Sequence, residues 1–297
     1  MNPRERGFLL LTSQLGNPDR VSLSPTQLRK LSGLISNTEA SREDRELEDR
    51  DLIALGCTPE LAHRITTLLQ EEELLDHYLL RGARAGCIPI TRVTPGYPTV
   101  LRKRLGAEAP GCLWAKGDLN LLEQPGIALV GSRDLRSANQ AFARESGRQA
   151  AFQGLVLISG NARGADLEAQ NACLEAGGQV ISIVADELTR HTPGDRMLYL
   201  SEDSFDAPFS TLRALRRNRT IHSLGRAVLV AQATLQKGGT WDGTSKNLRF
   251  GWTNVACFRD GSDAAQVLTQ MGAEAIDLDD LQDLPALFKY TRTFFDP

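Results

Sequence analysis

Two short apolar segments that each run into glycine, serine and arginine place the strongest constraint on this chain. The first is Gly126–Arg133, with the sequence GIALVGSR, and the second is Leu155–Asp166, with the sequence LVLISGNARGAD. In each segment a strand-length apolar run stops where a helix is expected to begin. Glycine at such a junction allows a tight turn and lets an anion approach the free N–H groups of the new helix. Arg133 and Arg163 add guanidinium groups that match phosphate geometry. The pattern predicts a parallel sheet with a phosphate-binding edge.

Strand-like and helical segments alternate after residue 88. Apolar strands are predicted at 88–90, 112–115, 127–130, 155–158, 179–184, 227–231 and 254–258, with shorter candidates at 199–202 and 275–278. Helices are predicted at 100–105, 137–152, 165–176, 241–250 and 262–271, with one more around Ile221. This alternation is typical of an α/β fold with a doubly wound, mostly parallel sheet. Ligands of such sheets bind at the carboxyl ends of the strands.

Residues 1–84 are predicted to form a small N-terminal helical domain, and residues 85–297 the α/β domain. A helix that starts after Thr58 is expected to continue to Leu79, because apolar residues recur at helical spacing. Residues 41–50 alternate acidic and basic side chains, which predicts an exposed helix or loop. Two short helices around Gly56 fit a helix-hairpin-helix DNA module and, equally well, a simple packing unit.

The charge distribution bears on possible partners. The net charge of the 297 residues is −3, so a nucleic-acid site would have to be a local basic patch. Residues 211–226 contain no acidic side chain and carry the arginines Arg213, Arg216, Arg217, Arg219 and Arg226. The shorter cluster Arg102–Arg104 is expected to be a solvated helix face.

The apolar runs and the cysteines indicate the compartment. No apolar run approaches the ~20 residues that span a bilayer, and the apolar stretch near the N-terminus is short for a signal peptide, so a cytoplasmic protein without membrane partners is expected. Five scattered cysteines predict free buried thiols. Neither the cysteines nor the histidines show metal-ligand spacing, so no metal and no cofactor are predicted.

Several blocks resemble the DNA-processing protein A (DprA/Smf) family. Trp114–Asp118 followed by Ile127–Arg133 is similar to the opening of that family's Rossmann domain, and Ser159–Asp166 is similar to its SGxAxGID turn. Leu200–Glu202 followed by Arg217–Ile221 resembles its LSE…RNRII block. The resemblance extends over roughly residues 88–275 and implies an extended Rossmann-like sheet. It also implies a single-stranded DNA-binding protein without catalysis, a homodimer that loads a RecA-type recombinase in DNA recombination and natural transformation.

The family's DNA- or phosphate-binding positions can be carried over residue by residue. They are Gly131, Ser132, Arg133, Ser159, Gly160, Asn161, Arg163, Arg217, Asn218, Arg219, Gly238, Gly239 and Thr240. The resemblance leaves two roles open for Arg217, Asn218 and Arg219, which either hold the strand or brace the pocket.

The chain also departs from the family pattern. Gln170 stands where the family has histidine, Gln232 where it has an acidic residue, and Arg259-Asp260 where it has Pro-Gly. A chain that stops at Pro297 is expected to lack the family's C-terminal winged-helix domain. These departures favour a divergent member, with a toxin or defence protein as an alternative partner.

A second alternative is a nucleotide sensor or enzyme. Lys237–Thr244 faintly resembles the loop of LOG-type phosphoribohydrolases, but their catalytic glutamate is missing and Asp242 is the only substitute. Five further side chains are expected to have structural roles. Asp166 is expected to brace the glycine turn or cap the helix, Glu202 to pair with an arginine, His222 to be buried, and both Trp241 and Trp252 to pack in the core.

Overall fold

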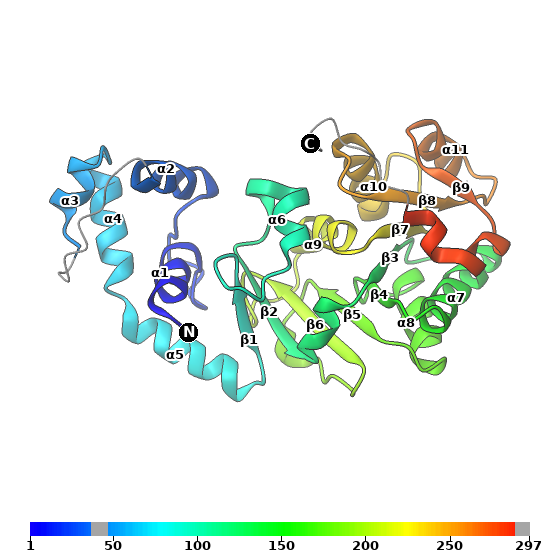
Figure 1. The fold of residues 1–297 in the computed structure, drawn as a ribbon, viewed down its shortest axis with the longest axis horizontal. Coiled ribbons are helices and arrows are strands. Elements are labelled where there is room, and N and C mark those ends of the chain that lie inside the picture. The colour runs from blue at the N-terminus through cyan, green and yellow to red at the C-terminus, as the bar shows by residue number, and fades with distance from the viewer. Residues whose placement is uncertain (37–46, 289–297) are drawn as a thin grey trace.

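The computed structural model describes residues 1–36 and 47–288, and within them one nine-stranded sheet crosses the molecule (Figure 1). The strands from edge to edge are β1 (Ile88–Thr91), β2 (Cys112–Gly117), β6 (Met197–Glu202), β5 (Val180–Val184), β4 (Val156–Ser159), β3 (Gly126–Val130), β7 (Ala227–Val230), β8 (Asn254–Phe258) and β9 (Glu274–Ile276). β2 is antiparallel to β1 and β6, and every other pair is parallel. The predicted α/β class with a mostly parallel sheet is confirmed, and 199–202 proves to be a strand.

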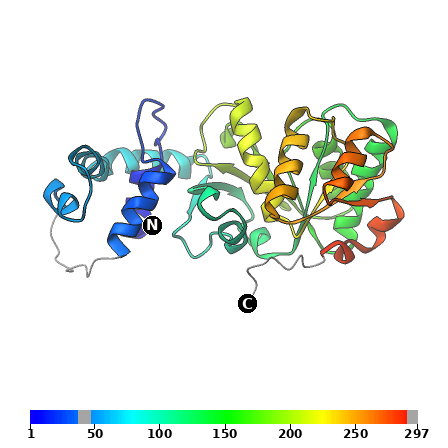
Figure 2. The ribbon, with the colours of Figure 1, turned by 90° about the horizontal axis from the view of Figure 1, so that it is seen from above.

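Helices cover both faces of the sheet, as Figure 2 shows. One face packs against α7 (Ser137–Phe152), α8 (Ala165–Glu175) and the 3₁₀ segment η4 (Asp279–Phe288). The other packs against α6 (Thr99–Leu105), α9 (Thr211–Leu224), α10 (Gly238–Phe250) and α11 (Asp263–Gln270). Short 3₁₀ turns η1 (Gly106–Glu108), η2 (Leu119–Glu123) and η3 (Leu188–Arg190) complete the connections. Successive β3 side chains enter opposite cores, which is why its sequence is apolar throughout.

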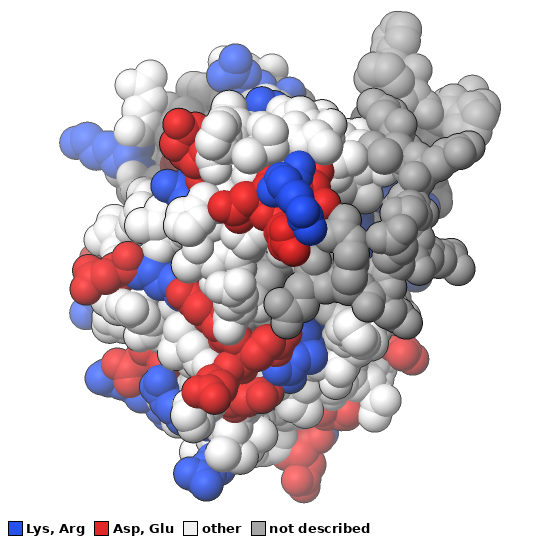
Figure 3. Space-filling model, turned by 90° about the vertical axis from the view of Figure 1, so that its left-hand side faces the viewer, with Lys and Arg blue, Asp and Glu red and all other residues white. Residues whose placement is uncertain are grey.

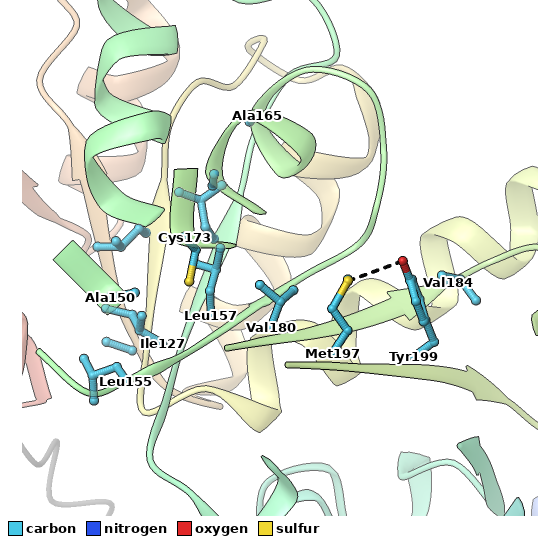
Figure 4. Packing of buried hydrophobic residues seen from close by; sticks show 14 of the residues in the cluster. Ile127, Ala150, Leu155, Leu157, Ala165, Cys173, Val180, Val184, Met197 and Tyr199 are labelled. Carbon is cyan, nitrogen blue, oxygen red and sulfur yellow. Dashed lines mark hydrogen bonds between the residues drawn. The ribbon is translucent and has the colours of Figure 1, made fainter. Parts of the chain in front are cut away.

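Four of the five cysteines lie inside these two cores, and Cys57 lies in a smaller core among the N-terminal helices, so the predicted burial is confirmed. All five are buried and free. Figure 4 shows Cys173 of α8 packed beside Leu157 of β4, in the same cluster as Ile127 of β3 and Val180 of β5. Burial raises the pKa of the Cys173 thiol to about 12. A thiol in this state is inert at neutral pH, so it serves packing and not nucleophilic chemistry.

Within the described residues 1–36 and 47–87, five helices precede the first strand: α1 (Pro3–Thr12), α2 (Pro25–Ser36), α3 (Asp49–Ala54), α4 (Pro59–Leu69) and α5 (Glu72–Arg84). Leu31, Leu52 and Ile65 form a small core of their own. Leu9 of α1 and Tyr78 of α5 instead join the core of one sheet face, so this helical part and the sheet share packing. The domain boundary at residue 84 stays a prediction. Residues 41–46 of the predicted exposed segment lie outside the described ranges.

The expected single helix from Thr58 to Leu79 is wrong. The helix ends at Leu69, and α5 starts at Glu72. At the break, the Glu71 carboxylate accepts a hydrogen bond from the buried Arg20 guanidinium, with Nε and Oε2 2.5 Å apart. Arg20 also donates to the Leu10 and Ser13 carbonyls at the C-terminal end of α1. A tertiary contact therefore overrides a continuous helical pattern at this point. None of the helices in the described ranges is long and apolar enough to cross a membrane.

Candidate nucleic-acid interface

The sheet reverses its direction of growth between β3 and β7. From β3 the chain adds β4, β5 and β6 on one side, and it returns to add β7, β8 and β9 on the other. The loops that follow β3 and β7 therefore lead to opposite faces of the sheet from its carboxyl edge, the usual ligand position in such sheets. Residues 131–136 and 231–237 form these loops, and residues 160–164 follow the neighbouring β4. We call this region the switch-point site.

Three helices begin at this site without a side-chain N-cap. The residues that precede them are Arg136 before α7, Gly164 before α8 and Lys237 before α10, and none of these three accepts a side-chain hydrogen bond from its helix. In α8 the N–H groups of Ala165 and Leu167 already donate to backbone carbonyls, so the first-turn N–H groups that can attract an anion are those of α7 and α10. Because Gly238 and Gly239 have no side chains, an anion can reach the backbone of α10 closely.

Hydrogen bonds tie the loops of the switch-point site together. The Thr240 hydroxyl donates to the Gly131 carbonyl at 2.9 Å, and the Ala165 N–H donates to the Ser132 carbonyl at 3.1 Å. Gly131 has to be glycine, because a Cβ at this position would lie 2.4 Å from the Cβ of Ala165. The first helical turns of α8 and α10 are thus held in fixed positions beside the loop after β3.

Asp166 braces the glycine turn after β4, as predicted. One of its carboxylate oxygens accepts hydrogen bonds from the N–H groups of Gly160, at 3.1 Å, and Ala162, at 3.2 Å. Burial raises the pKa of this carboxyl group, while Arg217 and the two N–H groups act in the opposite direction. Between Gly160 and Ala162, Asn161 adopts a left-handed backbone conformation with φ of 57°, which asparagine tolerates better than most residues.

Arg217 supports the same turn from α9. Its side chain is buried, and Nη2 donates to the Gly160 carbonyl at 2.8 Å. Burial lowers the pKa of this guanidinium, and the nearby Asp166 carboxylate opposes that effect. A Cβ on Gly160 would lie 1.6 Å from Nη1, so the arginine occupies the space that any side chain would need. Asn218 donates to the Gly239 carbonyl at 3.0 Å. In this structure both residues brace the pocket.

The remaining predicted residues occupy three kinds of position. Arg133 and Arg163 are exposed at the switch-point site, where Arg163 pairs with Asp134 at 2.9 Å. Ser159, by contrast, is fully buried and accepts a hydrogen bond from Gln170, which also donates to Ser182. Arg219 lies away from the phosphate loops, 3.6 Å from the Glu202 carboxylate and 3.4 Å from that of Glu108. The structure thus separates Arg219 from the loops with which the family pattern groups it.

A polar network that the sequence pattern did not reveal links three loops of the site. Asp260, after β8, accepts hydrogen bonds from Asn139 and the Ser262 N–H, at 2.7 and 2.9 Å, and pairs with Arg136. Burial would raise the pKa of Asp260, but the hydrogen bonds from Ser262, Asn139 and Arg136 together lower it. Gln232 accepts from the Arg136 N–H at 3.0 Å. Two of the family departures, Gln232 and Asp260, therefore belong to one local arrangement.

Several side chains outside the phosphate loops serve packing, as expected. His222 is fully buried with Nδ1 3.1 Å from the amide nitrogen of Asn247, and burial lowers its pKa to about 3. Trp241 and Trp252 pack, partly buried, against the second core. The expected solvated face at Arg102–Arg104 is wrong for Arg104, which donates to the Ser223 and Gly225 carbonyls at the end of α9. Those carbonyls lack helical partners, and an arginine satisfies them.

The end of the molecule formed by the N-terminal helices has a mixed charge pattern. Figure 3 shows acidic and basic side chains interspersed there. Arg6 pairs with Glu72 and Asp76, for example. This face is not the broad positive surface that phosphate binding favours. The helix-hairpin-helix interpretation gains no support from it.

Comparison with known proteins identifies a family whose matched region includes the switch-point site. The sequence model of the family described as DNA recombination-mediator protein A matches residues 89–284, which contain all of the switch-point loops. The chain belongs to this family. DNA processing protein DprA of Streptococcus pneumoniae is 32% identical over 196 residues, a match that covers 62% of this chain and 68% of that protein. Protein Smf of Escherichia coli is 32% identical over 140 residues, which cover 43% of this chain and 37% of Smf.

Solved structures of family members share the fold. The X-ray structure of S. pneumoniae DprA superposes with a TM-score of 0.72 at 24% identity and covers 98% of this chain and 100% of that one. A Helicobacter pylori DNA processing protein A, described for its single-stranded DNA binding mode, has a TM-score of 0.56 at 21% identity, with 67% of this chain and 95% of that chain covered. The first of these likenesses includes the N-terminal helices as well as the sheet.

Proposed function

We propose that the chain is a single-stranded DNA-binding protein of DNA processing, and that the switch-point site holds the strand by its phosphates. The observation that carries this proposal is the presence of the uncapped N-termini of α7 and α10 at the same sheet edge as the exposed guanidinium of Arg133. The H. pylori relative, described as binding single-stranded DNA, supports the same ligand.

The chemistry of the site favours binding without sequence preference. Backbone N–H groups and arginine forks contact phosphate oxygens, which are identical at every nucleotide. A local site of this kind is also compatible with a net charge of −3, since the remaining surface need not attract DNA.

We propose further that the protein acts without catalysis. Two carboxylates beside the glycine-rich turns already have partners, because Asp166 accepts two backbone N–H groups and Asp242 pairs with Lys246 at 2.8 Å on α10. Neither is arranged as a free general acid or base. The name of the matched family, recombination-mediator, supports recombinase loading as the role that this binding serves, and we propose that a homodimer performs it.

The test is fluorescence anisotropy with labelled oligo-dT, a duplex of equal length and a mononucleotide, each at two salt concentrations. We expect salt-sensitive binding to the single strand. Arg133→Ala should weaken binding to all sequences alike and reduce the salt slope by about 0.7–1.

The matched control is Arg196→Ala. Arg196 is also exposed but immediately precedes β6, at the opposite, amino edge of the parallel strands. Unchanged affinity and salt slope in Arg133→Ala would contradict the site assignment. Binding of the mononucleotide alone would favour the nucleotide-sensing alternative, and release of a free base from it, abolished by Asp242→Asn, would favour an enzyme.

A further inference from the structure

A basic hollow lies on the other side of α9 from the switch-point site. Its volume is about 1130 Å³, and it opens between the N-terminal helices and the β1–β2–β6 edge of the sheet. Figure 2 shows α9, in yellow, between the N-terminal helices and α10. The hollow, which we call the arginine groove, is lined by six arginines: Arg29, Arg92, Arg102, Arg213, Arg216 and Arg219. Three carboxylates also line it, so positive charge is in excess.

Tight packing holds the two walls of the arginine groove in place. Tyr78 of α5, Trp114 of β2 and Phe205 form an aromatic cluster with ring centroids 4.7–5.3 Å apart. The Tyr78 hydroxyl donates to Asp206 at 2.9 Å, and Arg81 pairs with the same carboxylate at 2.7 Å. A preformed cavity of this kind can bind a ligand without a large ordering cost.

The arginines of the groove differ in how far they are already engaged. Arg92 donates to three backbone carbonyls, and Arg213 donates to the Ala185 carbonyl and the Ser201 hydroxyl. Arg219 lies between two carboxylates. Arg216, however, is exposed and makes no hydrogen bond or ion pair with any residue in the described ranges. Burial raises the pKa of the Asp203 and Glu202 carboxyl groups and the charge of Arg216 acts against that rise, but the N–H groups of Arg216 have no hydrogen-bond partner in those ranges and can still bind an anion.

Apolar side chains separate the arginine groove from the switch-point site. Phe209, Leu212 and Leu215 are exposed by 55%, 65% and 38% on and just before α9. Leu215 also lies near Gly239 at the start of α10, so this apolar strip runs from the phosphate loops toward Arg216. An exposed aromatic ring next to cationic groups is the pattern on which unpaired bases stack while phosphates are neutralised, and Phe209 supplies that ring beside the two leucines.

We propose that the arginine groove binds the continuation of the same DNA strand, whose bases lie on the strip formed by Phe209, Leu212 and Leu215 and whose next phosphates reach Arg216. This inference rests on the proposed function, since it extends the track of a strand already held at the switch-point site. The excess positive charge of the arginine groove would also suit an acidic protein segment. The strip favours a single strand, because it connects the two basic sites over one helix and offers the bases an apolar surface.

The experiment compares oligo-dT of about 6 nucleotides with oligo-dT of about 24, a range that brackets the sites covered by single-strand binding folds. Phe209→Ala and Arg216→Ala should weaken binding of the long oligonucleotide, by about tenfold for the lost stacking contact. The short one, confined to the switch-point site, should bind as to the unaltered protein. Arg133→Ala should weaken both, and Arg196→Ala neither.

The outcomes separate the two proposals. If the unaltered protein binds no single strand, the proposed function fails. If it binds both lengths, but the Phe209 and Arg216 variants bind the long oligonucleotide normally, only the continuation track is refuted. A polyglutamate peptide is the competing probe: loss of its binding in Arg216→Ala, with long-DNA binding intact, would overturn the inference in favour of an acidic protein partner.

Discussion

The Asp166 carboxylate offers the sharpest test of how the phosphate site is built. It is buried, and one oxygen accepts two backbone N–H groups of the turn after β4. Asp166→Asn can keep an acceptor oxygen in the same place while losing the charge. Asp166→Ala removes the acceptor and leaves the N–H groups of Gly160 and Ala162 unpaired. The pair of variants therefore separates the charge from the hydrogen bonds.

The expected magnitudes follow from these contacts. A hydrogen bond to a charged acceptor contributes about 1.5–3 kcal/mol and a neutral one about 0.5–1.5. Loss of both bonds should thus lower the free energy of unfolding by about 4 kcal/mol in Asp166→Ala. Asp166→Asn keeps an acceptor oxygen, and because burial raises the pKa of Asp166, folding disfavours its charged form, so removal of the charge should lower the free energy of unfolding by less than about 1 kcal/mol. With a urea slope of about 3 kcal/mol per M, the unfolding midpoint should fall by about 1.3 M in Asp166→Ala and by less than about 0.3 M in Asp166→Asn.

Urea unfolding followed by circular dichroism, with single-strand anisotropy on the folded variants, provides the assay. Asp134→Asn is the matched control, because that carboxylate belongs to the same site but is exposed and pairs only with exposed Arg163. Its stability should be unchanged, since surface ion pairs contribute little. Equal midpoints for Asp166→Ala and the unaltered protein would refute the claim that this carboxylate holds the turn.

Three further predictions concern the same framework. Gly160→Ala should displace the Arg217 guanidinium and reduce single-strand affinity at least as much as Arg133→Ala does, which anisotropy will show. His222 stays neutral in the fold because its pKa is about 3, below the usual 6.5 of the unfolded chain. Stability is therefore lost as the pH falls from 6.5 toward 3, by about 2 kcal/mol at pH 5, and urea midpoints of His222→Leu should lack this component. Asp260 has a lowered pKa, so its contribution is complete above pH 3.8 and is lost as the pH falls below that value; the stability difference from Asp260→Asn, measured by thermal unfolding, should shrink in that window.

The sequence predicted the sheet well because its strands are buried on both faces. A strand such as β3 contains no polar side chain, so its apolar run stands out in the sequence, and a glycine follows its last residue. The phosphate loops could also be predicted from the sequence, because Gly131 and Gly160 each come soon after such an apolar run. The N-terminal helices were predicted less well. Their apolar spacing is continuous across Glu71, where the helix breaks at a contact with the buried Arg20 that comes from a distant part of the chain.

Local pattern alone thus determined the α/β class, the element order and the glycine-rich turns, because these depend on spacing and backbone conformation within a few residues. The tertiary structure decided what each arginine does. Arg217 and Arg219 are two residues apart on one helix, so they project to different sides of it. One is buried against the Gly160 carbonyl and the other faces the arginine groove. Whether a guanidinium is a brace or a ligand contact depends on its neighbours in space, and those come from strands and loops distant in the chain.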